Sequence, residues 1–485
     1  MPTVPAEQPP AEQADEPPPV QAPDPADLAA CLRLLELARS ASPDDPRWRT
    51  VHEAAAQVHR AGKKARKAAR SAERRSNDLA LLAATTRFQD QNPSPDARPA
   101  AGADARPPRA GQRVLAAARR CYVCKAPFRD VHPDYHQLCP ACARENAARR
   151  NARCDLRGRR AVVTGGRVKI GFQVALKLLR DGAEVLVTTR FPRDAARRFA
   201  AVDDCGDWLG RLHVHGVDLL DLPGVAGLLE AVHARFDHLD VLVNNAAQTV
   251  RRPAAYHRDV RAAEALPLTG PAARVDVAQA APGTALAPGP GATLAPGAMA
   301  DLALRDDALF PSGRTDETGE PLDLRARNSW NLRLHEVDPA EWAEVQMVNA
   351  FAPFLLTARL RGLLEASPWP DRYVVQVSAM EGSFSRVHKT VRHPHTNMAK
   401  ASLNMMTRTS AADYAAAGIH MTSVDTGWVT DERPHPGKLA QRAAGFRPPL
   451  DVIDGAARVY DPIVRGVGGE RLSGLFLKDY RPVEW

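Results

Sequence analysis

Residues 161–171 read Ala-Val-Val-Thr-Gly-Gly-Arg-Val-Lys-Ile-Gly, an apolar run that ends in a glycine-containing turn. An amphipathic stretch follows, with residues 173–179 predicted to be helical. A strand that ends in such a turn at the start of a helix forms an anion site, because backbone N–H groups and the helix dipole face the same point. We therefore expect a strand at residues 161–164, then a helix, and a phosphate site between them.

The same alternation of strand and helix continues along the chain and defines the fold class. Further strands are predicted at residues 184–188, 212–217, 241–244, 373–377, 421–424 and 475–477, and helices at residues 342–364 and 400–414. Alternating strands and helices indicate βαβ units. We predict an α/β fold, a Rossmann-type doubly wound parallel sheet over residues 155–485.

Residues 253–330 interrupt this pattern. They contain a run of alanine, proline and glycine that is expected to build neither strand nor helix. A connection of this length is functional or disordered. We expect a low-complexity insertion that is disordered or serves in part as a lid.

The N-terminal part of the chain has a different composition. Residues 1–26 form a proline-rich tail that we expect to be disordered, residues 27–88 a helical basic segment, and residues 89–117 a linker. Residues 60–75 carry eight Lys or Arg against one Glu. A solvated helical face is the favoured interpretation, and contact with nucleic acid the less favoured one, because no aromatic side chains are interleaved with the charges.

Composition limits the setting in which the protein works. The chain has 485 residues, a net charge of +8 and 41 prolines, which fits two to three units with extended segments between them. No apolar run approaches the ~20 residues of a membrane span. The start of the chain lacks the basic and apolar regions of a signal peptide. We predict a cytoplasmic protein without a membrane segment.

Four of the seven cysteines form a regular pattern within residues 118–150. They are Cys121, Cys124, Cys139 and Cys142, in two Cys-x-x-Cys pairs. Two such pairs can supply four thiolates to a tetrahedral zinc ion and leave no open position for chemistry. The prediction is a structural zinc site in a ribbon-like module, and a redox dithiol is the alternative.

Several ordered motifs give the chain a family resemblance. They are Thr164-Gly-Gly-Arg-Val-Lys-Ile-Gly171, Asn244-Asn-Ala-Ala, Val348-Asn-Ala-Phe and Thr396-Asn-Met-Ala-Lys400. Together they resemble the short-chain dehydrogenase/reductase family over roughly residues 157–482. The family pattern of the first motif is Thr-Gly-x-x-x-Gly-x-Gly, and Lys169 replaces its middle glycine. A lysine there would add a cation beside a pyrophosphate, provided that its φ is negative.

The resemblance implies a binding site for a nicotinamide dinucleotide. The residues expected to contact it are Gly165, Arg167, Lys169, Ile170, Gly171, Arg190, Asp218, Asn245, Ala246, Lys400, Thr426 and Val429. Arg190 follows the second strand, where an acidic residue would bind a ribose 2′-hydroxyl. An arginine there suits a 2′-phosphate, so NADP is favoured over NAD.

The catalytic part of the resemblance is incomplete. In the family a tyrosine donates the proton, a lysine four residues later assists it, and a serine and an asparagine complete the set. Lys400 and Asn349 match, but Thr396 stands in place of the tyrosine. Ala379 stands in place of the serine, and Ser378, one residue earlier, could face the wrong way on its strand.

Three hypotheses follow from this mismatch. In the favoured one the protein is an NADP-dependent oxidoreductase acting on a small molecule, with His395 or a neighbouring histidine (His388, His393) as the acid/base. Arg386, Lys389 and Arg392 would then favour an anionic substrate. In the second the protein binds NADP without turnover, as a sensor or scaffold. In the third the basic helix and zinc module bind nucleic acid. A homo-oligomer is expected from the resemblance.

Overall fold

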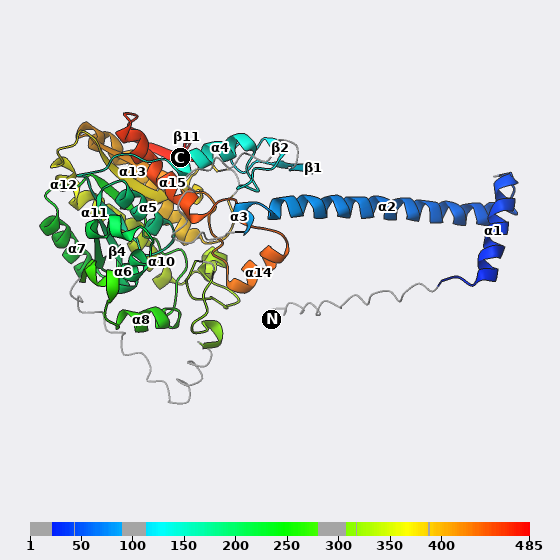
Figure 1. Ribbon diagram of the computed structural model, residues 1–485, viewed down its shortest axis with the longest axis horizontal. Helices are drawn as coiled ribbons and strands as arrows, with labels where there is room; N and C mark the ends of the chain where they lie inside the picture. The colour runs from blue at the N-terminus through cyan, green and yellow to red at the C-terminus, as the bar shows by residue number, and fades with distance from the viewer. Residues whose placement is uncertain (1–21, 43, 90–112, 280–306, 317, 387–388) are drawn as a thin grey trace, which may run out of the picture. The chain divides into compact units, whose positions relative to one another are not determined.

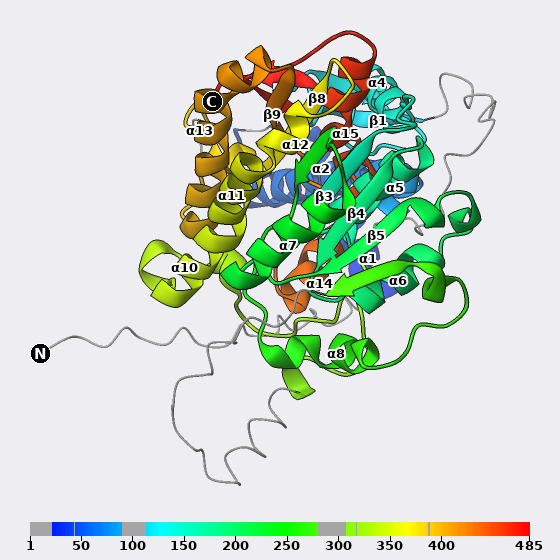
Figure 2. The same cartoon turned by 90° about the vertical axis from the view of Figure 1, so that its left-hand side faces the viewer.

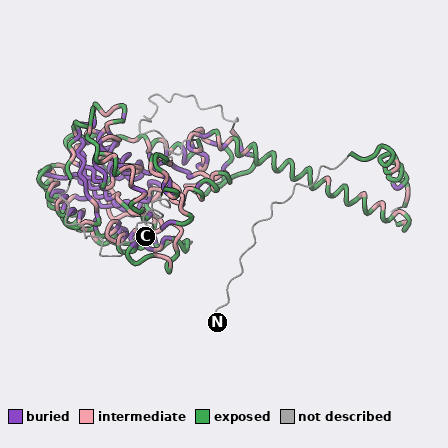
Figure 3. The backbone as a smooth tube through the Cα atoms, turned by 90° about the horizontal axis from the view of Figure 1, so that it is seen from below, coloured by how far each residue is buried: buried purple, intermediate pink, exposed green. Residues whose placement is uncertain are grey.

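The computed structural model describes residues 22–42, 44–89, 113–279, 307–316, 318–386 and 389–485. The chain divides into two compact units, residues 1–76 and 77–485. The first contains α1 (Pro25–Ser40) and most of α2 (Arg49–Ala83), whose residues are mostly exposed (Figure 3). Asp24 caps α1 by accepting a hydrogen bond from the Ala26 N–H at 2.7 Å. Nearly all of the expected tail and linker, residues 1–21 and 90–112, lies outside the described residues.

A nine-stranded sheet forms the centre of the second unit (Figures 1 and 2). Its strands are β3 (Arg160–Thr164), β4 (Glu184–Thr189), β5 (Leu212–Gly216), β6 (Val241–Asn244), β7 (Asp276–Gln279), β8 (Arg372–Ser378), β9 (Ile419–Asp425), β10 (Leu475–Lys478) and β11 (Arg481–Val483). The order is β11-β10-β9-β8-β6-β3-β4-β5-β7, and every pairing is parallel except that of β10 with β11. The predicted α/β class with a doubly wound parallel sheet is confirmed.

Helices cover both faces of this sheet. One face packs against α5 (Lys169–Arg180), α6 (Pro192–Ala200) and α15 (Val452–Val467), and the other against α7 (Leu222–Arg235), α11 (Ala352–Arg359), α12 (Arg361–Glu365) and α13 (Pro394–Ala416). Val163 points into the first layer and its neighbour Val162 into the second, as alternation along a strand requires. Burial on both faces explains why the central strands are continuous apolar runs.

The strand order reverses between β3 and β6. From β3 the chain builds outward through β4, β5 and β7, and from β6 it builds the other way through β8, β9 and β10. In doubly wound sheets ligands bind in the crevice at the carboxyl ends of the strands where this reversal occurs. The fold therefore places a binding crevice above Thr164 and Asn244.

The segment 253–330 contains more regular structure than its composition indicates. Three short helices, η3 (Ala254–His257), α8 (Arg258–Glu264) and η4 (Gly270–Arg274), lead into β7, which pairs with β5. Phe310 and Leu322 are buried. The Ala-Pro-Gly run, which was expected to build neither strand nor helix, falls within residues 280–306 and lies outside the described residues, so that expectation stays a prediction.

The cysteine module packs directly onto the sheet-bearing unit. It comprises a hairpin of β1 (Val114–Arg120) and β2 (Pro127–Asp130), then α4 (Pro140–Arg150), and α3 (Thr86–Gln89) precedes it. Its core, with Leu115 and Leu138, continues into Val429 and Leu450. The expected linker is therefore too long at both ends, since α3 and β1 occupy residues 86–89 and 114–120.

Buried polar contacts hold α4 against α15. The Tyr135 hydroxyl donates to Asp454 Oδ1 at 2.9 Å, and Arg150 forms ion pairs with Asp451 and Asp454. Asp451 and Asp454 also cap the start of α15 reciprocally. Breaking one partner of such a buried pair leaves an uncompensated charge, so this interface is fixed.

The remaining described helices lie near the carboxyl ends of the strands. They are α10 (Pro339–Gln346), the π-helical turn η7 (Met347–Phe351), η5 (Ser329–Asn331), η6 (Leu334–Glu336), η8 (Met380–Gly382) and α14 (His435–Ala443). Two further short helices, η1 (Cys205–Asp207) and η2 (Leu209–Arg211), precede β5. Sequence periodicity predicted α10 to α12 as one helix, and the structure divides it at η7 and Leu360.

Candidate active site and cysteine centre

The glycine turn after β3 is packed so tightly that side chains are excluded. A Cβ on Gly171 would lie 2.2 Å from the Gly165 carbonyl oxygen, and one on Gly166 would lie 2.7 Å from Val187. Gly165 has φ +68° and would place a Cβ 2.9 Å from the Ala246 Cα. The turn and the start of α5 thus form a close cradle of backbone atoms, as an anion site at a helix N-terminus requires.

Asn245 braces this cradle from the neighbouring strand. Its side-chain amide donates to the carbonyl oxygens of Thr164 and Gly165 at 3.0 and 3.1 Å. The Thr164 hydroxyl accepts hydrogen bonds from the N–H groups of Asn245 and Ala246, both at 3.0 Å. These contacts join the ends of β3 and β6 at the point where the strand order reverses.

Lys169 adopts a different conformation from the one that its expected role needs. Its φ is +53°, so the condition of a negative φ is not met. The Lys169 Nζ lies 2.8 Å from Glu432 Oε1. Burial lowers the pKa of Lys169, but the nearby carboxylates, Glu432 first and then Asp316 and Glu320, together outweigh burial and raise it. Lys169 thus fills the glycine position at a backbone cost, and its ammonium is neutralised within the chain.

The other cation of the turn, Arg167, is also paired. It lies 2.7 Å from Asp194 Oδ2 on α6 and donates to both oxygens of Glu320 at 2.8 and 2.9 Å. Glu320 belongs to the segment that follows the low-complexity run. Carboxylates from two segments late in the chain, Glu320 and Glu432, thus lie at the cations of the glycine turn.

A cavity of about 540 Å³ lies beyond the ends of β4 and β5. Arg190 and Asp218 line it, as do Arg193, Arg261 and Glu264 from α6 and α8. The Glu264 carboxylate accepts hydrogen bonds from the N–H groups of Arg193 and Asp194 and so caps α6. The described part of the insertion therefore supplies one wall of a cavity that two predicted contact residues line.

Lys400 and Thr396 lie one turn apart on α13, on the same face. The Lys400 Nζ donates to the Val377 carbonyl oxygen at 2.6 Å, and burial lowers its pKa to about 8. The Thr396 hydroxyl donates to the His393 carbonyl oxygen at 2.8 Å and is buried. The Thr396 hydroxyl is therefore used in a hydrogen bond to the backbone at the start of its own helix instead of pointing into the crevice.

Ser378 also faces away from the crevice. Its hydroxyl donates to Asn404 Oδ1 on α13 at 2.6 Å, and the residue is buried. The next residue, Ala379, carries no polar side chain. The predicted serine position thus has no hydroxyl directed at the carboxyl end of β8, as alternation along the strand led us to expect.

Asn349 occupies the π-helical turn η7, a local irregularity that is frequent at functional sites. Its Oδ1 accepts from the Gln248 N–H at 2.6 Å, and its Nδ2 donates to the Gln248 carbonyl oxygen at 3.1 Å. The side chain therefore holds the loop after β6 next to this turn. The Asn349 carboxamide thus acts as a brace, and its part in a water relay stays a prediction.

The predicted acid/base His395 lies apart from Thr396 and Lys400. Its ring is buried, and Nε2 lies 3.4 Å from Glu341 on α10. Residues 395 and 400 are five positions apart on one helix, which is about 140° around its axis. The ring of His395 therefore faces α10. The sequence suggested that His395 lies in a loop before Thr396, but α13 already begins at Pro394, and the helix fixes the direction of the side chain.

A different histidine lies beside Thr396. His393 Nδ1 is 3.4 Å from the Thr396 hydroxyl oxygen and 3.0 Å from Asn397 Oδ1. Its ring stacks on Trp330 at 4.1 Å, and burial lowers its pKa. Trp330 belongs to the insertion, so the sequence could not show this stacking. His388, the third histidine considered, lies outside the described residues.

The positive charge predicted near this region is partly neutralised. Arg386 pairs with Glu381, the Lys389 Nζ donates to the Glu381 carbonyl oxygen at 2.6 Å, and Arg392 donates to Asn331 Oδ1 at 3.2 Å. Because these three cations already bond within the chain, they give less support to an anionic substrate than the sequence indicated.

The segment after β9 carries the predicted residues Thr426 and Val429. Val429 is buried in the core of the cysteine module, where Ile170 from the glycine turn also packs. The Asp425 side chain accepts hydrogen bonds from the N–H groups of Met380 and Gly427 at 2.7 and 2.9 Å. The ends of β8 and β9, the glycine turn and the cysteine module therefore meet at one edge of the crevice.

The four cysteines converge as their spacing predicts. The sulfur atoms of Cys121, Cys124, Cys139 and Cys142 all lie within 4.8 Å of one another. The Cys139 N–H donates to the Cys121 sulfur at 3.3 Å. A hydrogen bond from the Ala126 backbone lowers the pKa of Cys124 to about 7, whereas burial raises that of Cys142. Four thiols at this separation fit one tetrahedral ion with Zn–S distances of about 2.3 Å.

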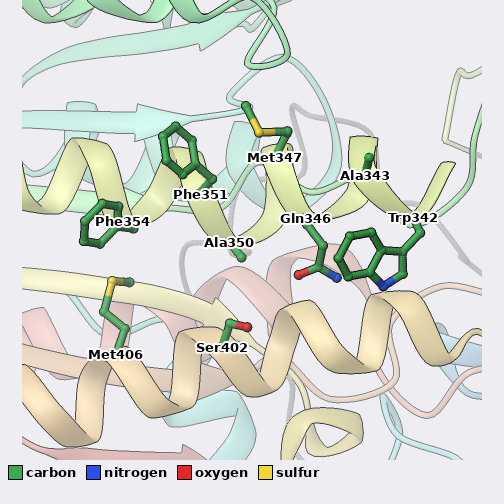
Figure 4. Close-up of a pocket in the computed structure, with 9 residues that line it drawn as sticks. All are labelled: Trp342, Ala343, Gln346, Met347, Ala350, Phe351, Phe354, Ser402 and Met406. Carbon is green, nitrogen blue, oxygen red and sulfur yellow. The ribbon is translucent and has the colours of Figure 1, made fainter. Parts of the chain in front are cut away.

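An apolar surface lies between α10–α11 and α13, apart from the crevice. A cavity of about 540 Å³ is lined by Trp342, Ala343, Gln346, Met347, Ala350, Phe351, Phe354, Ser402 and Met406. Figure 4 shows Trp342 and Met406 in the space between the two helical segments. Trp342 and Phe354 are 42% and 53% exposed, which is unusual for aromatic side chains of this size.

The doubly wound sheet, the glycine cradle and the lysine on α13 define a class of nucleotide-binding oxidoreductase folds. Comparison with known families is consistent with that class. The profile of the short chain dehydrogenase family matches residues 159–268, and that of the enoyl-(acyl carrier protein) reductases matches residues 326–441. The chain belongs to the short-chain dehydrogenase family.

Individual relatives differ in how much of the chain they match. An uncharacterized protein of Acanthamoeba polyphaga mimivirus, R665, is 32% identical over 357 residues, which is 71% of each chain. A fatty acyl-CoA reductase of Acinetobacter baylyi is 31% identical over 98 residues, or 20% of this chain and 32% of its own. A probable oxidoreductase of Streptomyces lividans is 39% identical over 92 residues, 19% of this chain and 29% of its own. The chain thus spans about a third of the length of these two relatives, whose names state an activity.

Solved structures are similar at lower identity. The NADPH-bound carbonyl reductase from chicken fatty liver is 17% identical, with 68% of this chain and 100% of that one covered and a TM-score of 0.42. An NADP complex of a short chain dehydrogenase from Burkholderia cenocepacia is 20% identical, with coverage of 67% and 97% and a TM-score of 0.43.

A search of the described residues for membrane segments gave a negative result. None of their helices combines the length and the apolar character needed to cross a bilayer.

Proposed function

We propose that residues 155–485 bind NADP(H) and transfer a hydride between it and a carbonyl or alcohol group of a small molecule. The observation that carries this proposal is the cradle formed by Gly165, Gly166 and Gly171 and braced by Asn245. Added Cβ atoms would collide with backbone or strand atoms at all three glycines. The N–H groups of Gly165 and Gly166 bond to Thr188, so the N–H groups at the start of α5 are the ones that would face a pyrophosphate.

The two halves of the dinucleotide would extend in opposite directions from this cradle. The cavity at β4 and β5, with Arg190 and Asp218, is the place for the adenosine half. The other half then lies over the ends of β6, β8 and β9, because the crevice runs across the reversal of strand order. The nicotinamide would therefore reach Lys400 on α13 and the segment from Asp425 to Val429.

A preference for NADP rests on the cations at the adenosine end. Arg190, Arg193 and Arg261 all line the cavity. A 2′-phosphate would gain charge-assisted hydrogen bonds from them. Glu264 opposes it, because its carboxylate already caps α6 there. The preference for NADP over NAD therefore depends on whether the attraction of the three arginines exceeds the repulsion by Glu264, which binding measurements decide.

Lys400 would hold the ribose of the nicotinamide half. No acidic side chain among the residues that the structure describes pairs with it, and its pKa of about 8 leaves it mostly charged at neutral pH. A buried ammonium without a carboxylate partner needs acceptors from elsewhere. Ribose hydroxyl groups would supply them together with the Val377 carbonyl oxygen.

His393 is the group we propose for proton transfer, in place of both the family tyrosine and His395. The cofactor supplies a hydride, and reduction of a carbonyl also requires one proton at its oxygen. Asn397 Oδ1 accepts from His393 Nδ1, so Nε2 is the ring nitrogen that exchanges a proton. Stacking on Trp330 fixes the ring at the start of α13, about two helical turns before Lys400 and next to Thr396.

Calorimetry with NADPH and NADH tests the binding part of this proposal. Wild-type protein should bind NADPH, and Arg190→Glu should weaken NADPH more than NADH. Arg258→Glu provides a control, since Arg258 pairs with Asp307 outside the cavity. If wild-type protein binds neither dinucleotide, the proposed function is wrong.

Consumption of NADPH with a panel of aldehydes and ketones tests the catalytic part. Turnover that needs His393 supports the proposal. Tight NADPH binding with no turnover over the panel would favour the second hypothesis, a binding protein without hydride transfer, because the Thr396 and Ser378 hydroxyl groups are both used inside the fold.

For the cysteine centre we propose a structural zinc ion bound by Cys121, Cys124, Cys139 and Cys142. Four protein thiolates leave no coordination position for substrate, so the ion would stabilise the module. Metal analysis should find one zinc per chain, and Cys124→Ser should lower that content and the melting temperature. A Cys121–Cys124 disulfide without metal would contradict the proposal.

The exposed apolar surface on α10, α11 and α13 supports a homo-oligomer. Contiguous exposed aromatic side chains usually mark an interaction surface. Light scattering should show more than one chain per particle, and Phe354→Asp, at a 53% exposed position, should yield monomers. A cytoplasmic location stays a prediction, and the two matching family models, which describe a dehydrogenase and a reductase, do not favour nucleic-acid binding.

A further inference from the structure

Tyr122 links the cysteine module to the crevice. It lies between Cys121 and Cys124, and its phenol oxygen accepts a hydrogen bond from the Trp428 N–H at 3.0 Å. A Cβ on Gly427 would lie 3.5 Å from the same oxygen. A residue of the proposed metal-binding knuckle therefore contacts the backbone that follows β9.

The contacted backbone has an unusual shape that needs support. Gly427 has φ +76°, and a Cβ there would lie 2.6 Å from Leu450. On its other side the Asp425 carboxylate accepts from the Gly427 N–H. Tyr122, Leu450 and Asp425 thus enclose one left-handed turn from three directions.

Lys478 links the ring of Tyr122 to the carboxylate of Asp425. Its Nζ lies 5.4 Å from the centre of the Tyr122 ring and 3.3 Å from Asp425 Oδ1. A cation at this distance is attracted by the aromatic ring, so Lys478 helps to hold the ring and the carboxylate at the same turn.

We propose that Tyr122 is a positioning residue for the nicotinamide half of the dinucleotide. It acts through the Gly427–Trp428 backbone, which the proposed function places beside that half, and the inference rests on that function. The metal centre fixes the knuckle, the knuckle fixes Tyr122, and Tyr122 fixes the turn. The cysteine module is then part of the cofactor site as well as a brace for the fold.

The structure also shows why this role needs the module. Cys121 and Cys142 share an apolar core with Val429, and Ile170 from the glycine turn packs against it. Movement of the knuckle would therefore shift both the turn after β9 and the loop that faces the pyrophosphate. Metal binding and binding of the nicotinamide half should be coupled, and such coupling acts in both directions.

The test compares two ligands on Tyr122→Phe protein that retains its metal. One ligand is NADPH, and the other is adenosine 2′,5′-bisphosphate, which lacks the whole nicotinamide half and the pyrophosphate. Loss of one hydrogen bond to backbone should weaken NADPH by roughly fivefold. Affinity for the second ligand should stay unchanged, because its contacts lie on the β4 and β5 side.

Tyr414→Phe is the matched control. The Tyr414 hydroxyl also bonds to the backbone, donating to the Thr357 carbonyl oxygen at 3.1 Å, but it lies in a different core, away from the cysteine module. Its loss should lower stability and leave both affinities as they are. Metal content is measured for all proteins, so that a metal-free variant is not compared with a loaded one.

The possible results separate this inference from the proposed function. Selective loss of NADPH affinity in Tyr122→Phe supports it. Unchanged affinities, or equal losses for both ligands, overturn the inference and leave the proposed function standing. Failure of wild-type protein to bind either ligand overturns both.

Discussion

The glycine turn and the start of α13 face the same crevice and have diverged from the family pattern in opposite ways. At the turn, Gly165, Gly166 and Gly171 are enclosed by neighbouring atoms, and Asn245 braces them with two hydrogen bonds. At α13, the hydroxyl of Thr396 bonds to the His393 carbonyl oxygen, and the hydroxyl of Ser378 bonds to Asn404 inside the fold.

The difference follows from what each region contributes. The turn binds with backbone groups, so its requirement is space, and any side chain there collides. The α13 region contributes side-chain chemistry, which another side chain can supply from a different position. Lys169 is an exception to this exclusion of side chains from the turn. Its backbone adopts φ +53° at a conformational cost, and its side chain gains an ion pair with Glu432.

The experiment with the largest expected effect removes His393, the side chain that we propose has replaced the tyrosine in proton transfer. His393→Gln should lower kcat for carbonyl reduction by about 10²–10⁴-fold and leave NADPH affinity close to that of wild type. Burial lowers the pKa of His393 from 6.5, so the wild-type reduction rate should fall as pH rises through a value below 6.5, because the protonated ring is lost. Stopped-flow measurement of NADPH consumption checks both effects.

His395→Gln is the control for that experiment. His395 is buried against Glu341, so its loss should lower stability and leave kcat nearly unchanged. If kcat falls with His395→Gln and not with His393→Gln, the assignment from the structure is wrong and the earlier prediction from the sequence is restored.

A second experiment tests the glycine turn, which binds through backbone groups. Gly171→Ala would place a Cβ 2.2 Å from the Gly165 carbonyl oxygen and 2.4 Å from Asn245 Nδ2, so the turn and its brace must both move. We expect NADPH affinity to fall by roughly 100-fold, equivalent to about 2.7 kcal/mol. Calorimetry on folded protein, verified by circular dichroism, measures this.

Gly227→Ala is the matched control for Gly171→Ala. Gly227 lies within α7, and an added Cβ meets no atom within 4 Å. Alanine in such a helix should raise stability by about 0.5–1 kcal/mol and leave NADPH affinity unchanged. Equal losses of affinity in both variants would show that the cradle has no special role.

The parts of the fold that could be predicted from the sequence are those set by local patterns. Apolar runs such as residues 161–163 are strands because both faces of the sheet are covered, and the glycine turn follows from the need for close packing. Cys121 and its partners converge because paired cysteines bring two ligands together. Thr396 was found because Lys400 fixes its position one helical turn away.

The parts that the sequence could not provide depend on contacts between distant segments. His393 was passed over in favour of His395, because only the start of α13 at Pro394 and the stacking on Trp330 distinguish them. The partners of Arg167 and Lys169 come from residues 153 and 263 positions later, Glu320 and Glu432. Strand β7 was missed because four residues beside a low-complexity run carry too little pattern.

The pH dependence of NADPH binding tests the proposed role of Lys400 on α13. Burial lowers its pKa to about 8, so the charged form predominates at pH 7 and the neutral form at pH 9. If the ammonium holds the ribose, NADPH affinity should fall by about tenfold over this range. The same shift makes the free protein more stable as pH rises from 8 toward 10.5, because the unfolded chain still binds the proton.

Lys400→Met separates this effect from other titrations. Its NADPH affinity should be lower at pH 7 and nearly constant up to pH 9 when calorimetry is repeated at each pH. A pH dependence equal to that of wild type would show that another group is responsible.

Glu432→Gln tests whether the ion pair of Lys169 competes with the cofactor, and its effect should be the smallest. The Glu432 carboxylate lies 2.8 Å from the Lys169 ammonium, at the edge of the proposed pyrophosphate site. A neutral amide would leave the lysine free to pair with a phosphate, so NADPH affinity should rise by roughly fivefold even though the free protein loses stability. Glu184→Gln is the control, because Glu184 pairs with His213 at the amino end of β4, away from the crevice. Weaker NADPH binding by Glu432→Gln would mean that the ion pair shapes the turn for the cofactor, and Lys169 would then belong with the glycines as part of the cradle.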